Sequence, residues 1–355
     1  MSGMKITELN LQNFRNFHKI KFELEGTTVI YGPNASGKSS IIEAVNLLAT
    51  GHSMRAGFDR DMVSFNKDHS KVEGKTDTTK LEISIAKSEV AENLARKKYK
   101  VNGVARMLNN FAGNFKCVTF TPLDLEVITD GPQVRRRYLD LILFQTSREY
   151  RTSHTNLTKV IKNRNKILEK INEFGKGYNE IGFWNDLLVK ESEVIHKHRK
   201  NFFHSIKDKI NSHGKSLDPT CETLEIHYKV NEATFERIKE YQIKEIASKS
   251  TLLGPNRDDF SILLNKREIG SFGSRGQQRA AVLSLKLSEI DFLEESSLEN
   301  ERPVLLLDDI FSELDEKHRE QILNIVELQQ TIITTADKHY LKEFPSFEKV
   351  INLEK

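Results

Sequence analysis

One loop has the residue types and spacing for phosphate binding. The run Gly32-Pro33-Asn34-Ala35-Ser36-Gly37-Lys38-Ser39, followed by Ser40, matches GxxxxGK[ST] at every fixed position. In that pattern the glycines let backbone N–H groups approach phosphate, the lysine reaches the β- and γ-phosphates, and the hydroxyl ligates Mg²⁺. We therefore expect residues 32–40 to bind ATP, with Ser39 as a Mg²⁺ ligand. The alternative is a glycine-rich turn that matches by chance.

The residues on both sides of this loop support the first interpretation. Residues 27–31 are β-branched and aromatic, which is typical of a buried strand in a parallel sheet. Downstream, apolar residues recur at helical spacing, with no Pro or Gly before Gly51. The loop is thus expected at a strand-to-helix junction, where the helix N-terminus favours an anion.

A second segment has carboxylates that such a site needs. Residues 303–307 form an apolar run, typical of a central parallel strand, and Asp308 and Asp309 follow it. We expect Asp308 to hold Mg²⁺, directly or through water, and Asp309 to be the general base for the attacking water. Together with Lys38 they are the predicted catalytic residues. The alternative is that both acids cap the next helix, a role that Ser312-Glu-Leu-Asp315 could also fill.

A third segment precedes a helix that the apolar spacing predicts over residues 277–293. The run Ser274-Arg275-Gly276-Gln277-Gln278 resembles the LSGGQ signature of ABC ATPases, with Gly273 and Arg275 replacing the usual Leu and Gly. In that class the signature usually completes the ATP site of the opposite protomer. The resemblance therefore implies a homodimer in which Ser274, Gly276 and Gln277 contact ATP across the interface. The alternative is a polar turn before an ordinary helix.

A further buried strand is expected over residues 331–335. It ends in Thr334 and Thr335, where ABC ATPases often carry a histidine that senses the γ-phosphate. Any such sensing in this chain would have to use a hydroxyl.

The order of these motifs resembles the RecF family, bacterial SMC-like ABC ATPases of recombinational repair. The resemblance also covers residues 4–17 with the turn Asn13-Phe-Arg-Asn16, and segments 52–55, 120–125, 131–140, 253–260 and 305–315. It implies an α/β fold: an ABC-type P-loop ATPase head with a helical, short coiled-coil-like insert lobe. Two residues depart from the family pattern, Leu123 for a usual acid and Asn256 for a usual His. Leu123 lies in the stretch that plays the Q-loop role, which couples the nucleotide to the helical lobe. No Gln is present there, and Asp124 is assigned to that role.

The resemblance also implies a function. ATP and Mg²⁺ would join two heads on gapped or duplex DNA, and slow, DNA-dependent ATP hydrolysis would release them. The family implies RecO and RecR as partners, with which it supports loading of RecA. Arg55 would be a charge stabiliser or a DNA contact, and a surface arginine is the alternative.

The composition of the chain indicates in which cellular compartment the protein is expected. The chain has 355 residues and no apolar run long enough to span a membrane, and it lacks a signal-peptide pattern, so we expect a cytoplasmic protein without membrane association. Cys117 and Cys221 have no metal-ligand spacing and fit reduced thiols.

The positive charge is concentrated in one insert. Residues 134–214 contain 17 Lys and Arg against 9 Asp and Glu, a net charge of +8 in a chain whose total is +3. This insert is predicted to form two helices, 134–173 and 181–212, of about 40 residues and roughly 60 Å each, split at Gly175-Lys-Gly177. Its cations, Arg135, Arg136 and Arg137 among them, are expected to contact the DNA backbone without reading bases. A solvated helix face is the alternative.

A second basic run, residues 96–100, precedes the hairpin signal Asn102-Gly103. Its cations could contact DNA or guard an edge strand against aggregation. The expected organisation is residues 1–120 as the N-terminal part of the head, 121–250 as the helical insert, and 251–355 as the signature helix, the carboxylate strand and the rest of the head.

Three rival functions differ from this hypothesis in testable ways. A DNA nuclease on an SMC-like head would need further acidic metal ligands, and Asp258-Asp259 is the only unclaimed pair. The nucleotide-binding subunit of a transporter is disfavoured by the basic insert and the missing histidine. Nucleotide binding without useful turnover would differ only in the role of Asp309.

Overall fold

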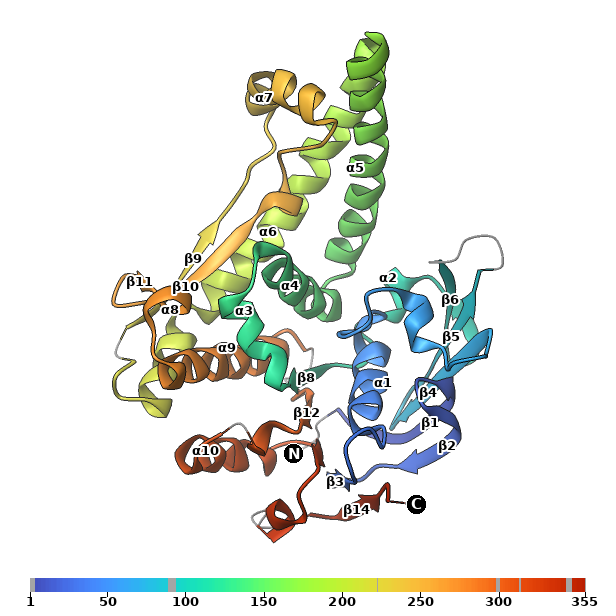
Figure 1. Cartoon of the computed structure of the whole chain (residues 1–355), viewed down its shortest axis with the longest axis vertical. Coiled ribbons are helices and arrows are strands. Elements are labelled where there is room, and N and C mark those ends of the chain that lie inside the picture. The colour runs from blue at the N-terminus through green and yellow to red at the C-terminus, as the bar shows by residue number, and fades with distance from the viewer. Residues whose placement is uncertain are drawn as a thin grey trace.

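A head built on two sheets carries a projecting pair of long helices (Figure 1). The computed structural model describes residues 4–88, 94–221, 223–297, 301–312, 314–342 and 347–354. The projecting helices are α5 (Arg148–Phe174) and α6 (Tyr178–Leu217), which pack against each other along their length. They form the arm of the molecule.

The first sheet joins the two ends of the chain. Its order is β14-β3-β13-β12-β8, and every neighbouring pair is parallel. Strand β3 (Thr27–Tyr31) lies between β13 (Thr331–Thr335) and β14 (Lys349–Asn352), and β12 (Val304–Asp308) lies between β13 and β8 (Cys117–Phe120). Strands β12 and β13 are buried throughout, as the apolar run of β12 and the β-branched residues of β13 predict. The head is therefore discontinuous in sequence.

The second sheet is antiparallel, with the order β2-β1-β4-β5-β6-β7. Its strands are β1 (Ile6–Phe14), β2 (Phe17–Glu23), β4 (His69–Thr76), β5 (Lys80–Lys87), β6 (Ala95–Val101) and β7 (Val104–Arg106). Helix α1 (Lys38–Thr50) packs between the two sheets and is buried on almost every side. The predicted hairpin at Asn102-Gly103 joins β6 and β7, with both residues at positive φ.

The remaining elements complete the head and the arm. A small antiparallel sheet, β11-β10-β9, lies beside α6. Its strands, the other helices and the short 3₁₀ turns are β9 (Leu224–Lys229), β10 (Asp259–Leu264), β11 (Arg267–Glu268), α2 (Leu108–Phe111), α3 (Glu126–Thr129), α4 (Pro132–Thr146), α7 (Phe235–Ser248), α8 (Ile269–Phe272), α9 (Arg275–Glu295), α10 (Glu316–Val326), η1 (Asp59–Met62), η2 (Pro122–Leu125), η3 (Pro255–Arg257), η4 (Ile310–Ser312) and η5 (Lys338–Lys342).

The prediction of one continuous helix over 134–173 is wrong. Helix α4 ends at Thr146, and Ser147 has extended backbone angles and caps α5 by accepting a hydrogen bond from the N–H of Tyr150. Serine is preferred at the N-cap of a helix because its hydroxyl accepts a hydrogen bond from a free backbone N–H of the first turn. The second helix has the predicted length of about 40 residues but extends beyond the predicted bounds 181–212: α6 has 40 residues, about 60 Å, whereas α5 has 27, about 40 Å.

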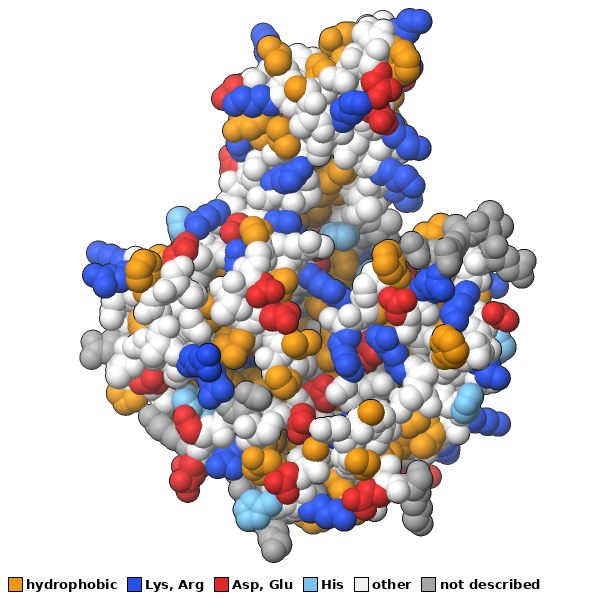
Figure 2. Space-filling view, viewed as in Figure 1, with side chains coloured by type: hydrophobic (Ala, Val, Ile, Leu, Met, Phe, Trp, Pro, Cys, Tyr) orange, Lys and Arg blue, Asp and Glu red, His pale blue; other side chains and the backbone are white. Residues whose placement is uncertain are grey.

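Three of the arm's cations, Arg151, Arg164 and Arg199, are buried. Arg164 donates to Glu245 at 2.6 Å and so ties α7 to α5, and its side chain is 1% exposed. Arg199 donates to Asp140 at 2.9 Å and to Asp258 at 2.8 Å. The surface of the arm thus carries fewer cations than the sequence of the arm contains. Lys and Arg side chains still lie along both edges of the arm (Figure 2).

Candidate nucleotide-binding site

The phosphate loop has the backbone that its glycines predict. It connects β3 to α1, with Ala35 at φ 66° and Gly37 at φ 106°. A Cβ atom on Gly37 would lie 2.5 Å from a ring carbon of Phe17 and 2.7 Å from Nδ2 of Asn16, so glycine is required there. The loop borders a cavity of about 760 Å³.

Lys38 is held over its own loop. Its Nζ donates to the carbonyl oxygens of Gly32 at 2.7 Å and Pro33 at 2.9 Å, and the residue is 6% exposed. The ammonium group is therefore largely desolvated, and both of these acceptors are uncharged. Phosphate oxygens would be stronger acceptors for such a group.

Three strands bring a set of oxygen ligands together. Ser39 follows β3, Asp308 ends β12, and Thr334 lies on β13 between them. The Ser39 hydroxyl donates to Oδ1 of Asp308 at 2.9 Å, and the Thr334 hydroxyl donates to the same oxygen at 2.8 Å. This edge, at the carboxyl ends of parallel strands, is where α/β proteins bind ligands. Hydroxyl and carboxylate oxygens are the donors that Mg²⁺ prefers.

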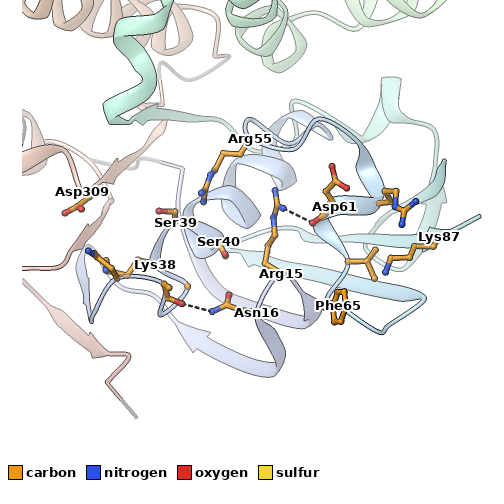
Figure 3. A pocket seen from close by; sticks show the side chains of 15 residues that line it. Arg15, Asn16, Lys38, Ser39, Ser40, Arg55, Asp61, Phe65, Lys87 and Asp309 are labelled. Atoms are coloured by element: carbon orange, nitrogen blue, oxygen red, sulfur yellow. Dashed lines mark hydrogen bonds between the residues drawn. The ribbon is translucent and has the colours of Figure 1, made fainter. Parts of the chain in front are cut away.

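Asp309 lines the same cavity as Lys38 and Ser39 (Figure 3). Its backbone is left-handed, at φ 51°, and its N–H is shared between the carbonyl and hydroxyl oxygens of Thr334, each at 3.1 Å. Asp315, not Asp308 or Asp309, caps α10 by accepting from the N–H of His318 at 3.0 Å. The cap of α10, a role that the alternative gave to the carboxylate pair, is thus supplied by Asp315.

The turn between β1 and β2 adds residues that sequence reasoning did not assign to the site. Arg15 forms a two-pronged ion pair with Glu43, a fully buried residue of α1, at 2.6 and 2.8 Å. Asn16 donates to the carbonyl oxygen of Ala35 at 3.5 Å, and both side chains line the cavity. The turn motif was visible in the sequence, but its spacing gave no reason to place it against the P-loop. Further lining residues without a sequence signal are Arg60, Asp61, Phe65 and Lys87.

The signature residues lie elsewhere. Ser274 caps α9, accepting from the N–H of Gln277 at 3.2 Å, while Oε1 of Gln277 accepts from the N–H of Ser274 at 3.0 Å. Ser274 and Gly276 are exposed. Neither they nor Gln277 line the P-loop cavity. One chain thus brings together Lys38, Ser39, Asp308 and Asp309 but not its own signature.

A second cavity, of about 440 Å³, extends from the carboxylates to α4 and α9. Its lining includes Asp124, whose carboxylate accepts from the N–H of Thr121 at 2.7 Å. Burial raises the pKa of Asp124 to about 6, although the nearby Lys286 ammonium acts against this. Arg55 lines both cavities, which places it beside the P-loop (Figure 3).

The three consecutive arginines make contacts within the chain. Arg135 pairs with Asp259 at 2.6 Å, Arg136 donates to the carbonyl oxygen of Asp258 at 2.8 Å, and Arg137 donates to that of Ser53 at 2.7 Å. Their expected role in DNA binding stays a prediction, and a DNA contact by Arg135 would compete with its ion pair.

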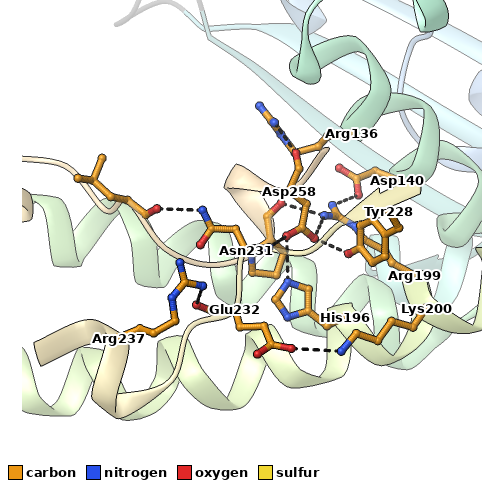
Figure 4. A network of polar contacts seen from close by, with 12 residues as sticks. Arg136, Asp140, His196, Arg199, Lys200, Tyr228, Asn231, Glu232, Arg237 and Asp258 are labelled. Atoms are coloured by element: carbon orange, nitrogen blue, oxygen red, sulfur yellow. Dashed lines mark hydrogen bonds and ion pairs between the residues drawn. The ribbon is translucent and has the colours of Figure 1, made fainter. Parts of the chain in front are cut away.

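Asp258 is the centre of a buried network (Figure 4). It accepts from Arg199, His196, Tyr228 and the N–H of Asn231. Burial alone would raise the pKa of this carboxyl, but the His196 hydrogen bond and the Arg199 charge hold it below its ordinary value. In the described part of the chain, no group of three or more His, Cys, Asp or Glu could hold a metal ion. Both carboxylates of the pair Asp258-Asp259 thus have a cationic partner within the chain, Arg199 for Asp258 and Arg135 for Asp259.

A discontinuous parallel sheet, a P-loop and a carboxylate strand beside it, and a signature helix together define an ABC-type ATPase head. The family model of the RecF/RecN/SMC N-terminal domain matches residues 5–355. The DNA replication and repair proteins RecF of Thermoanaerobacter pseudethanolicus and Lachnoclostridium phytofermentans are each 35% identical to this chain. The alignments cover 96% of this chain and 96% and 94% of those proteins. The chain belongs to the RecF family.

Solved structures agree with this assignment. A structure of the recombination mediator RecF with ATP, in the RecFOR pathway, is 32% identical and has a TM-score of 0.85 over 95% of this chain and 93% of that one. An Smc head domain from Pyrococcus furiosus, 16% identical with a TM-score of 0.51 over 98% and 93%, shares the fold. The family and fold class expected from the sequence are confirmed. Among the described residues, no helix is long and apolar enough to cross a membrane.

Proposed function

We propose that this chain is an ATP-dependent DNA-binding clamp of recombinational repair. Its relatives are named DNA replication and repair proteins, and a similar chain has been solved with ATP. In this proposal ATP closes two heads on gapped or duplex DNA, and slow hydrolysis reopens them. One observation supports closure by ATP of two heads: Ser274 lies outside the cavity that Lys38 and Asp309 line. A site with a P-loop and a separate, exposed signature is complete only when a second copy supplies the signature.

The roles within one half-site follow from the geometry. Residues 32–40 would cradle the phosphates with backbone N–H groups, and Lys38 would exchange its two carbonyl partners for phosphate oxygens. Ser39 and Asp308 would hold Mg²⁺, which neutralises charge on the phosphates. Asp309 would orient or deprotonate the attacking water. Asp124 would couple the site to the arm.

The signature half-site comes from the partner copy. The Ser274 hydroxyl and the first N–H groups of α9, a helix of 21 residues, form an anion site at the positive end of the helix dipole. Gly276 leaves that approach open because it has no side chain. Two copies related by a two-fold axis would form two identical composite sites.

The wider assignments are also proposals. We propose RecO-type and RecR-type mediators as partners, in line with the RecFOR pathway named for the solved relative, and a cytoplasmic location. We further propose functional segments at 1–120, 121–250 and 251–355, the first and last sharing the parallel sheet.

Solution mass tests this closure of two heads directly. The Asp309→Asn variant, measured by light scattering with and without Mg-ATP, is expected to shift from monomer to dimer because ATP accumulates unhydrolysed. Adding Ser274→Arg should abolish the shift while leaving binding of a fluorescent ATP analogue intact. A variant that binds ATP but stays monomeric would contradict the composite site.

A further inference from the structure

The outward face of the antiparallel sheet has an uneven distribution of charge. Residues that pair across the strands form a row of Lys19, Gln12, Lys71, Ser84 and Lys98, from β2 through β1, β4 and β5 to β6. This row contains cations and neutral residues but no acid. A short second row beside it, His69, Ala86 and Arg96, has the same character.

Acidic residues begin in the next row, where two of them are neutralised by lysines. Glu73 and Glu82 face each other across β4 and β5. Lys71 pairs with both at 3.1 Å, Lys80 pairs with Glu73 at 3.0 Å, and Lys100 pairs with Glu82 at 2.9 Å. In contrast, Lys19, Arg96 and Lys98 are exposed and have no ion pair with any residue that the structure describes.

The surface between these unpaired cations is hollowed. Small residues, Ser84 and Ala86, occupy the centre of the two rows and form the floor of a trough of about 660 Å³. Arg96 and Lys98 line one wall, and Lys71 and His69 line the other. Lys87 lines both this trough and the nucleotide cavity, so the two are adjacent. The sheet forms the flank of the head away from α9 and α10 (Figure 1).

We infer that this trough, and not the run of three arginines on α4, binds the phosphate backbone of DNA. The inference rests on the proposed function, which requires DNA contact without assigning it to this sheet. Five strands at about 4.8 Å spacing make the first row about 19 Å long. Duplex DNA carries about ten phosphates over that length of its axis. Flexible cations around small, neutral residues suit a backbone and offer little for reading bases.

The rows also supply matched variants. The row variant Arg96→Gln/Lys98→Gln removes two cations that have no ion pair with a described residue. The control variant Lys80→Gln/Lys100→Gln removes two paired cations from the same sheet and changes net charge equally. Both are measured with Mg-ATP and a fluorescein-labelled DNA duplex by anisotropy, over about 50 to 200 mM salt.

The row variant is expected to weaken binding about tenfold or more at low salt and to lower the slope of log K against log salt by about 1.8, since each phosphate contact contributes about 0.9. The control variant should keep a nearly wild-type slope. Equal losses in the two variants would reduce the effect to net charge and overturn the inference. If the wild-type protein shows no salt-dependent binding, the proposed DNA clamp fails as well.

An alternative role for these cations, protection of an open strand edge, predicts a different result with the same variants. Arg96 and Lys98 lie in the part of β6 that β7 does not cover, because β7 pairs only with residues 99–101. If the row variant binds DNA normally but self-associates in light scattering, the cations guard an open edge and do not form a DNA surface.

Discussion

Thr334 links the two carboxylates of the site. It occupies the region where ABC ATPases often carry a histidine, but its hydroxyl is hydrogen-bonded to both Asp308 and Asp309. Its hydroxyl donates to the carboxylate that would hold Mg²⁺ and accepts from the N–H of the residue that would activate water. A single hydroxyl thereby positions both acids, one by its side chain and one by its backbone.

Thr334→Val keeps the shape of this residue and removes both interactions. The hydrogen bond to the Asp308 carboxylate, a charged group, contributes about 1.5–3 kcal/mol. We therefore expect kcat for ATP hydrolysis to fall about 10- to 100-fold. The KM for ATP should change little, because Lys38 and the loop are untouched. Steady-state kinetics check this, and Thr334→Ser should restore most of the activity. A change in KM alone would instead assign Thr334 to nucleotide binding.

Asp124 should make stability depend on pH. Its pKa is raised from 3.8 to about 6 by burial. Between those values the folded state binds more protons than the unfolded state, so this group's stabilisation is present at low pH and is lost as pH rises. The Asp124→Asn variant has no carboxyl at this position, so this pH-dependent contribution to stability is absent from it. We expect the free energy of unfolding of the variant, relative to wild type, to increase by about 2 kcal/mol from pH 4 to pH 7. Urea denaturation at several pH values measures this, and a pH-independent difference would contradict the raised pKa of Asp124.

At the level of elements, local patterns predicted the site better than the arm. The strand before the P-loop, the helix after it, the carboxylate strand and the signature helix are encoded in short runs of sequence, and all are present. The break at Ser147 was missed because the apolar spacing continues through it, while a single cap decides the geometry. The burial of Arg164 and Arg199 could not be predicted, because their carboxylate partners lie 81 and 59 residues away in sequence.

A buried ion pair joins α5 to α7. Arg164→Met would leave Glu245, which is fully buried, without its cation, and we expect a loss of about 3–5 kcal/mol in stability. The double variant Arg164→Met/Glu245→Met should recover most of that loss, because an apolar pair needs no compensation. Lys170→Met, which breaks an exposed pair with Glu180 on the same arm, should change stability by less than about 1 kcal/mol. Thermal denaturation compares all three, and a double variant as unstable as the single one would contradict this account.

At the scale of the whole molecule, the chain's connectivity separates parts that must act together. The P-loop comes from the N-terminal third and the carboxylates from the C-terminal third, and the parallel sheet unites them. The sheet does not bring in the signature, which stays exposed at the start of α9. Hence the head has a complete phosphate-binding half and a complete signature half that do not meet within one copy.

Two impaired variants should therefore complement each other. Lys38→Met loses the phosphate half and Ser274→Ala loses the signature half, so each alone is expected to have little ATPase activity. A mixed dimer has one composite site with both defects and one with neither. Random mixing in equal amounts makes half of the dimers mixed, so activity should recover to roughly one quarter of wild type. Mixing Lys38→Met with the double variant Lys38→Met/Ser274→Ala is the control and should give no recovery. Full-length chains that dimerise with ATP yet fail to complement would show that Ser274 does not serve the partner's nucleotide.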